Sequence, residues 1–268
     1  MSYDARAQSL RCPFCGSTNL KDQPDATSIE ARRVIPFGVD RDGASAALRR
    51  WLGNGFWRPN DLSERAAITN MVAVYVPYWL FQTKTFTYWT ADTSQTPAGA
   101  RGDWYPLSGQ HHGQYEGHLI GASGVLTPQE TKLLCPFDTA SSVSPNEADL
   151  DTTIVEQFRV QRKYARPLAR QGVEELERQA CGRYVPGHSR NLKVNVRLEG
   201  LSSEPILLPV WILAYSYRGQ VYRFLLNGQT GKATGNAPTS RVKVAVAFTL
   251  VAVLVIAVLF GTLIATRS

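Results

Sequence analysis

The stretch MVAVYVPYWLF at residues 71–81 decides the fold. It is apolar along its whole length and rich in β-branched and aromatic residues, a composition typical of a buried strand. The segment TFTYWT at residues 85–90 follows it, alternates in polarity and is predicted to be its partner strand. The sequence therefore predicts a sheet built around a buried strand at 71–81.

A second apolar region, at residues 205–224, repeats features of the first. PVWI at 209–212 matches PYWL at 77–80, and alternating aromatic residues follow both tetrapeptides. Arg218-Gly219 lies where a hairpin turn is expected, and the strand returns over 221–226. An ancient duplication, two equivalent strands in one sheet, or chance would each explain the match.

Segments of helical and strand periodicity surround these regions. Asp40 or Asp42 is placed to cap a helix whose apolar residues recur at helical spacing, and the turn at 53–55 would end it. Pro167 is expected to break a long helical region in the second half of the chain. The pattern predicts an α+β body with a mainly antiparallel sheet, its further elements being helices over 44–52, 59–69 and 152–183 and a strand over 191–199.

The segment VAVAFTLVAVLVIAVLFGTLIA at residues 244–265 contains no charged residue. A helix of that length reaches roughly 33 Å, which matches a hydrocarbon core of about 30 Å and predicts one C-terminal transmembrane helix. Lys232, Arg241 and Lys243 precede the segment and Arg267 follows it, so the basic excess places the body in the cytosol. The predicted location is the cytoplasmic membrane, with a single pass and a cytosolic N-terminal domain.

The N-terminal part of the chain contains one Cys-x-x-Cys pair, in RCPFCGS at residues 11–17. Cys12 and Cys15 form one zinc knuckle, whereas a zinc ribbon needs two knuckles to supply four ligands. Cys135 and Cys181 would complete the site only if the fold brought them to the N-terminus; otherwise they are expected to be core residues. The metal site predicted at Cys12 and Cys15 is therefore incomplete within this chain, and zinc is a conditional cofactor.

Residues 159–197 are strongly basic, and their surplus of Lys and Arg over Glu equals the net charge of the whole chain, +7. Such a surface attracts an acidic protein, nucleic acid or anionic headgroups, and a solvated helix face explains it equally well. The candidate residues for binding an anionic partner are Arg159, Arg162, Lys163, Arg166 and Arg170.

Motifs of known enzymes are incomplete in this sequence. NGQTGKAT at 227–234 contains Gly-Lys, but Leu226 and Ala233 stand where a phosphate-binding loop requires glycine and a hydroxyl. The segment is expected to be a turn. The three histidines between residues 111 and 118 match no metal-ligand spacing and are not expected to be ligands. Because no nucleophile–base set, cofactor loop or small-molecule site is evident, the chain is predicted not to be an enzyme.

The knuckle, VIPF at 34–37, the strand at 71–81, the segment 207–240 and the basic residues before 244 together resemble the bacterial TFIIB-type zinc-ribbon membrane proteins. Some members of that family are labelled as primosomal replication factor or helicase-like. Members also show an earlier knuckle, which here would fall before Met1, so it is lost or the start codon is assigned too late. The expected domains are a partial ribbon at 1–20, a linker at 21–33, a cytosolic body at 34–240 and the transmembrane helix at 244–265.

The resemblance implies a non-enzymatic, tail-anchored membrane adaptor or scaffold at the bacterial cytoplasmic membrane. Its partners would be proteins, such as phage-shock-protein-A-like or SPFH-like proteins, in membrane-stress or membrane-organisation complexes. The alternative is a membrane-tethered nucleic-acid-binding protein that uses the basic stretch 159–197. Nucleic acid is the less favoured of the two partner classes.

Overall fold

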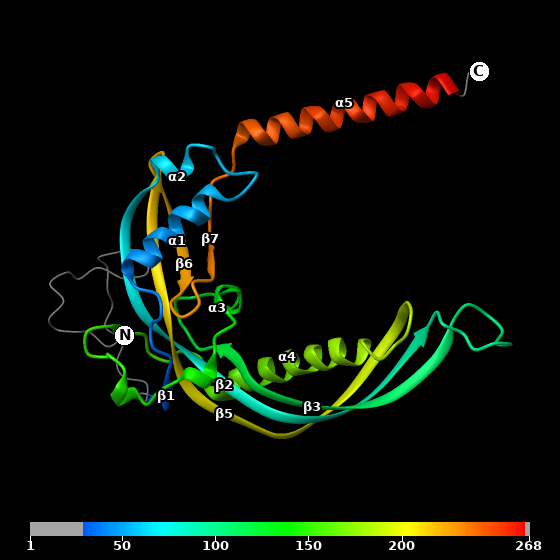
Figure 1. Ribbon diagram of the computed structural model, residues 1–268, viewed down its shortest axis with the longest axis horizontal. Helices are drawn as coiled ribbons and strands as arrows, with labels where there is room; N and C mark the ends of the chain where they lie inside the picture. Colours follow the sequence, from blue (N-terminus) through cyan, green and yellow to red (C-terminus); the bar gives the residue numbers. More distant parts are fainter. Residues whose placement is uncertain (1–28, 266–268) are drawn as a thin grey trace.

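The computed structural model describes residues 29–265, with side chains as far as Ile256. The body is a seven-stranded, mainly antiparallel sheet with the main strand order β3-β2-β5-β6-β7, which confirms the predicted α+β body. The sheet is strongly curved, and α4 lies along the inner side of the curve (Figure 1). The elements are β1 (Arg33–Val34), α1 (Arg41–Gly53), α2 (Leu62–Arg65), β2 (Ala67–Thr93), β3 (Tyr105–Gly121), α3 (Pro128–Leu134), the 3-10 turns η1 (Thr139–Ser141) and η2 (Pro145–Glu147), β4 (Ile154–Val155), α4 (Arg162–Gly182), β5 (Ser189–Tyr217), β6 (Gln220–Asn227), β7 (Ala233–Gly235) and α5 (Arg241–Ala265).

Two very long strands cross the body, β2 with 27 residues and β5 with 29, and they pair antiparallel along almost their whole length. The predicted partner strand at 85–90 is wrong, because these residues continue β2 and pair with β3 and β5 instead. Residues 82–84 are Gln, Thr and Lys, so the chain has no turn residue there. A register shift between Phe81 and Thr83 absorbs the irregularity without ending the strand.

Each long strand has the same kinds of neighbour, so the arrangement around β2 is repeated around β5. β2 pairs with antiparallel β3 from Tyr78 onward and with the short parallel strand β4 at 74–75. β5 pairs with antiparallel β6 from Val210 onward and with the short parallel strand β1 at 206–207. The corresponding positions are 132 residues apart in both cases (210 − 78 and 206 − 74). The matching tetrapeptides in the sequence are therefore equivalent positions of two repeats in one sheet.

The tryptophan of each repeat holds the start of a helix. Trp79 Nε1 donates to the carbonyl of Val160, just before α4, at 2.8 Å. Trp211 Nε1 donates to the carbonyl of Val39, just before α1, also at 2.8 Å. A phenylalanine two residues before each valine packs against the corresponding tryptophan, with ring centroids 5.4 and 5.5 Å apart. The two repeats thus place α4 and α1 on the sheet through the same set of contacts.

The repeats differ in length, and the extra length forms an arm of the sheet. We define the arm as residues 82–93 of β2, 105–118 of β3 and 189–202 of β5, which pair with one another. α4 has 21 residues against 13 in α1, and it covers the arm (Figure 1). The buried residues of α4 recur at helical spacing along one face: Ala165, Ala169, Val173, Glu177 and Cys181.

The first two predicted helices fare differently. α1 begins as predicted, since Asp40 caps it by accepting a hydrogen bond from the Gly43 N–H at 2.8 Å. The second predicted helix, at 59–69, is largely wrong, because α2 is a single turn and β2 already begins at Ala67. Residues from 67 onward pair with β5, and this pairing overrides a local helical pattern.

α4 begins at Arg162 instead of residue 152, and Pro167 does not break it. Proline has no N–H, so the carbonyl of Lys163 lacks its usual helical donor. Both Pro167 and Lys163 are exposed to solvent. Water can therefore satisfy the unpaired carbonyl, and the helix continues through the proline.

Two of the predicted turns, at 218–219 and within 227–234, join neighbouring strands as expected. Arg218 and Gly219, with φ of 49° and 78°, join β5 to β6 as a two-residue hairpin turn. After β6, the side-chain oxygen of Asn227 accepts hydrogen bonds from the N–H groups of Gln229 and Thr230, each at 2.9 Å. The Gly-Lys segment is thus part of a tight turn between two strands, a different structure from a phosphate-binding loop.

The predictions for the two ends of the chain have different outcomes. Cys12, Cys15 and the whole partial ribbon at 1–20 lie outside the described residues, as does most of the linker at 21–33. α5 is helical, but among residues 29–265 no helix is long and apolar enough to cross a membrane. This finding corrects the predicted transmembrane helix at 244–265, the single-pass topology and the membrane location.

Candidate functional site

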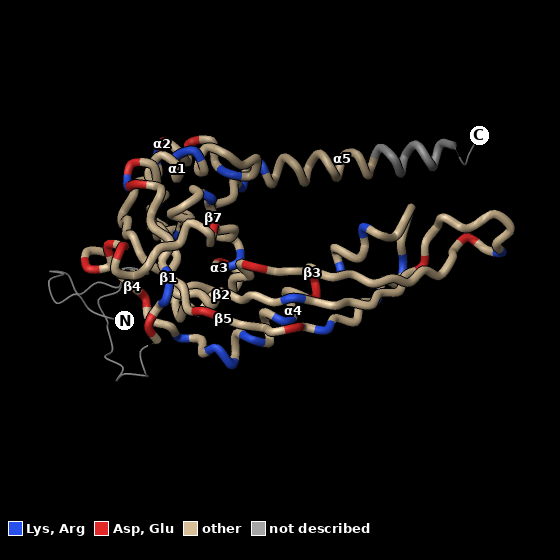
Figure 2. The backbone as a smooth tube through the Cα atoms, turned by 60° about the horizontal axis from the view of Figure 1, so that its bottom comes forward, with Lys and Arg blue, Asp and Glu red and all other residues tan. Residues whose placement is uncertain are grey.

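The structure brings three of the five predicted anion-binding residues to one groove. Lys163, Arg166 and Arg170 line a groove of about 880 Å³ between α4 and β5, whereas Arg159 and Arg162 are outside its lining. Basic segments mark α4 and the neighbouring part of the arm (Figure 2). The remaining lining residues supply a mostly apolar wall: Pro167, Leu198, Gly200, Leu201 and Ser202.

The helix orients these cations because its neighbouring face is fixed in the core. Ala165 and Ala169 are fully buried against Trp79 and Phe81 of β2. Lys163, Arg166 and Arg170 are three and four positions apart, so they share one flank of the helix beside this buried face and extend along the groove. Arg170 also pairs with Glu174, its Nε lying 2.9 Å from a carboxylate oxygen, which leaves the groove less uniformly positive than the sequence implies.

A second cluster of polar residues lies under α4 within the arm, around the carboxylate of Glu177. The Glu177 side chain is fully buried. Its Oε1 accepts hydrogen bonds from the hydroxyls of Thr85 at 2.5 Å and Tyr115 at 2.7 Å. Its Oε2 lies 2.8 Å from Nδ1 of His111. Gly113 makes this possible, because a Cβ at that position would come within 2.2 Å of Glu177 Oε1.

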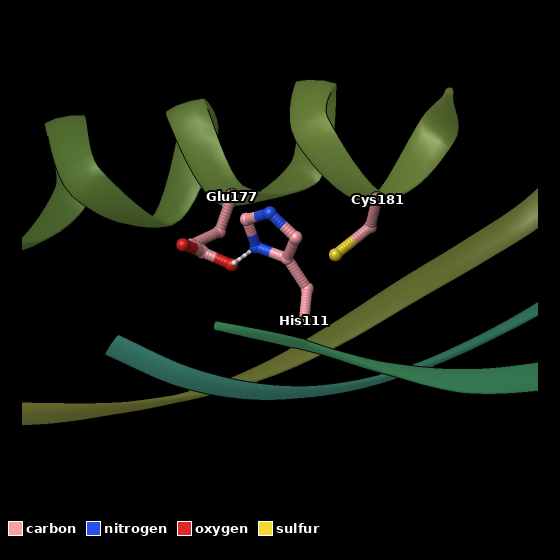
Figure 3. A group of neighbouring side chains, drawn as sticks. All are labelled: His111, Glu177 and Cys181. Atoms are coloured by element: carbon pink, nitrogen blue, oxygen red, sulfur yellow. Dashed lines mark hydrogen bonds and ion pairs between the residues drawn. The ribbon is translucent and has the colours of Figure 1, made fainter. Parts of the chain in front are cut away.

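Cys181 completes a group of three residues with metal-binding side chains. It lies one helical turn after Glu177, is fully buried, and faces His111 across the space between α4 and β3 (Figure 3). One ligand atom each from His111, Glu177 and Cys181 lies within 4.8 Å of the others. A nitrogen donor from β3 thus converges with an oxygen and a sulfur donor from α4.

The environment of this cluster sets its protonation. Burial would raise the pKa of Glu177, but the hydrogen bonds from Thr85, Tyr115 and His111 together outweigh burial and hold that pKa below its ordinary value. Burial and then the charge of Glu177 raise the pKa of the Cys181 thiol to about 11. Burial and the same carboxylate also raise the pKa of Tyr115. Near neutral pH Glu177 is therefore ionised although it is buried.

A second buried carboxylate, Glu156, has the opposite tendency. Glu156 comes directly after β4 and is 4% exposed. Its carboxylate accepts hydrogen bonds from the Ser123 hydroxyl at 2.8 Å and the Gly124 N–H at 2.8 Å. Burial is the largest effect and raises the pKa of Glu156 despite these hydrogen bonds.

We expect the two carboxylates to affect acid stability in opposite directions. Because the folded pKa of Glu177 is lowered, its stabilising contribution is present above the unfolded pKa of about 4.3 and is lost as pH falls through the folded pKa. The folded pKa of Glu156 is raised, so as pH falls the folded state takes up this proton before the unfolded state does. The free energy of unfolding therefore increases as pH falls from the folded pKa toward the unfolded pKa of about 4.3.

Urea unfolding at a series of pH values between neutrality and acid tests this expectation. Glu177→Gln should make the acid loss of unfolding free energy shallower, and Glu156→Gln should make it steeper. Parallel curves for the wild type and both variants would contradict the assignment.

Sequence reasoning predicted the basic residues of the groove but missed the buried cluster. His111 was not expected to be a ligand, and Cys181 was expected to be a core residue unless the fold brought it to the N-terminal knuckle. The one local signal was the spacing of Glu177 and Cys181, four positions apart on a helical face. Their meeting with His111, 66 positions earlier than Glu177, depends on how α4 crosses β3.

Comparisons with known proteins add one relative. The chain is 25% identical over 232 residues to the uncharacterized protein YdjG of Bacillus subtilis (strain 168), a match that covers 82% of this chain and 67% of that protein. No family model matches the chain, and no solved structure matches it. None of these findings tests the resemblance to the bacterial TFIIB-type zinc-ribbon proteins, which stays a prediction from the sequence. The function is therefore argued from the two sites of the molecule.

Proposed function

We propose that the protein is a non-enzymatic adaptor that binds an acidic segment of a partner protein in the groove between α4 and β5. One observation supports this proposal above all. Lys163, Arg166 and Arg170 extend along one wall of the groove, and Leu198 and Leu201 contribute to the other. A segment that alternates acidic and apolar side chains would satisfy both walls.

An acidic protein segment suits this groove better than nucleic acid does. The described lining residues include no aromatic side chain on which a base could stack. Apolar side chains at 198 and 201 favour a partner with apolar side chains of its own. Because of the sequence resemblance, acidic segments of phage-shock-protein-A-like or SPFH-like proteins are the first partners to examine.

The test measures binding of the full chain to three labelled probes by fluorescence anisotropy. The first probe is a peptide of alternating Glu and Leu, the second is a peptide of alternating Lys and Leu, and the third is a single-stranded oligonucleotide of the same net charge as the first. We expect the Glu–Leu peptide to bind most tightly, with an affinity that falls as salt is raised.

Reversing the three groove charges provides the matching variant. Lys163→Glu/Arg166→Glu/Arg170→Glu should weaken peptide binding by about tenfold or more, because three attractive charges become repulsive. The control is Arg41→Glu/Arg49→Glu/Arg50→Glu, which makes the same change in net charge on exposed positions of α1, the equivalent helix of the other repeat.

Three results would overturn the proposal. Equal losses in the two triple variants would show that net charge, and not the groove, attracts the peptide. Tighter binding of the oligonucleotide, lost only in the groove variant, would replace the acidic protein partner by nucleic acid. Failure of every probe to bind would remove the groove as a binding site.

A further inference from the structure

The buried cluster in the arm is separate from the groove and has its own chemistry. We propose that His111, Glu177 and Cys181 bind a divalent transition-metal ion of the zinc type, which links α4 to β3. This inference does not depend on the proposed adaptor function.

The backbone elements present the three donors in a way that suits a metal ion. Glu177 and Cys181 are four positions apart on the buried face of α4, a spacing that directs two side chains to the same point. His111 faces them from β3 (Figure 3). Their ligand atoms lie within 4.8 Å of one another. Donors around one tetrahedral ion are roughly 3.5 Å apart, so side-chain movements on the order of 1 Å close the site.

The neighbours of Glu177 hold it in the orientation that a ligand needs. The hydroxyls of Thr85 and Tyr115 both donate to Oε1. Oε2 is thereby directed toward His111 and away from these hydroxyls. Hydrogen bonds of this kind to a carboxylate ligand fix its direction and raise metal affinity. The absence of a side chain at Gly113 leaves the space in which the carboxylate and both hydroxyls lie.

The donor set selects the class of ion. A nitrogen, an oxygen and a sulfur donor suit zinc and similar transition metals, whereas magnesium and calcium prefer sites made of oxygen atoms. Glu177 and Cys181 are both fully buried. An ion bound there would cross-link a helix to a strand inside the arm and would add its binding energy to stability.

The test uses the full chain with Cys12→Ser and Cys15→Ser, so that the N-terminal knuckle cannot bind the metal. Cobalt(II) is titrated into the chelator-treated protein, and the thiolate-to-cobalt charge-transfer band is followed in the near ultraviolet. We expect one equivalent of cobalt to bind and the band to appear. Zinc should then compete with cobalt and raise the unfolding temperature of the same protein.

Single substitutions in this background identify the ligands. Cys181→Ser should abolish the charge-transfer band. His111→Ala and Glu177→Gln should each weaken cobalt binding by about tenfold or more, and Thr85→Val should weaken it on the order of tenfold through the orientation of Glu177. Cys135→Ser is the matched control: its thiol donates to the Thr131 carbonyl at 3.4 Å, lies outside the cluster, and should leave the band unchanged.

Circular dichroism shows whether each variant is folded before its cobalt spectrum is interpreted. If the serine background is folded and gives no band with one equivalent of cobalt, the proposal fails. It also fails if the band survives Cys181→Ser or disappears in Cys135→Ser. Should the serine background not fold, the wild type is compared directly with Cys181→Ser, and equal charge-transfer intensities in these two proteins would overturn the site.

Discussion

Replacing Trp211 by alanine is expected to lower the free energy of unfolding by about 3–5 kcal/mol, the usual cost of removing a large buried aromatic side chain. The indole is 8% exposed, packs against Phe37 and donates to the carbonyl of Val39. The substitution therefore leaves a cavity. It also removes the donor from the Val39 carbonyl, which fixes the start of α1.

The equivalent substitution in the other repeat should cost about as much. Trp79 is 5% exposed and makes the corresponding contacts with Phe158 and with the carbonyl before α4. Urea unfolding of Trp211→Ala and Trp79→Ala, followed by circular dichroism, measures both effects. Trp57→Ala is the control, because Trp57 is 46% exposed and its loss should change stability by about 0.5 kcal/mol or less.

The comparison tests the repeat as well as the packing. If one of the two buried tryptophans behaved like Trp57, the two halves of the sheet would not be held in equivalent ways. If both did, the indole contacts would contribute little to the placement of either helix.

Gly113→Ala is expected to destabilise the protein by about 1–3 kcal/mol, the usual cost of overpacking a core. A Cβ at position 113 would lie 2.2 Å from Glu177 Oε1 and 2.5 Å from Thr85 Oγ1. Glu177 cannot move aside freely, since Tyr115 and His111 also hold its carboxylate. The added methyl group must therefore displace the carboxylate from its hydrogen bonds or push α4 away from β3.

Two further variants separate this clash from a general effect of replacing glycine. Gly182→Ala, at the end of α4, is the control: its Cβ would make ordinary contact with Leu192 at 3.5 Å, and stability should change little. In a Glu177→Ala background the clash with the carboxylate is absent and only the contacts with Thr85 and Tyr115 remain, so adding Gly113→Ala should cost less than it does in the wild type. Equal costs in the two backgrounds, measured by urea unfolding, would contradict the predicted contact.

Local chemistry was sufficient for much of the fold. Asp40 caps α1 because its side chain reaches an N–H three residues later, and Arg218-Gly219 turns the chain because glycine accepts a positive φ at little cost. The apolar run at 71–81 could be placed in a buried strand for the same kind of reason, its composition. These features depend on residues close together in sequence, so a single segment contains the information needed to predict them.

The pairing of the strands and the meeting of the site residues depended on the path of the whole chain. Residues 85–90 have the alternation of a separate strand, and only their pairing with β3 and β5 shows that they continue β2. Of the five basic residues predicted to act together, only Lys163, Arg166 and Arg170 line the groove, because this part of α4 faces β5. His111 meets Glu177 and Cys181 because α4 lies against β3, a strand from a distant part of the chain. Such contacts join residues far apart in sequence, and no local pattern specifies them.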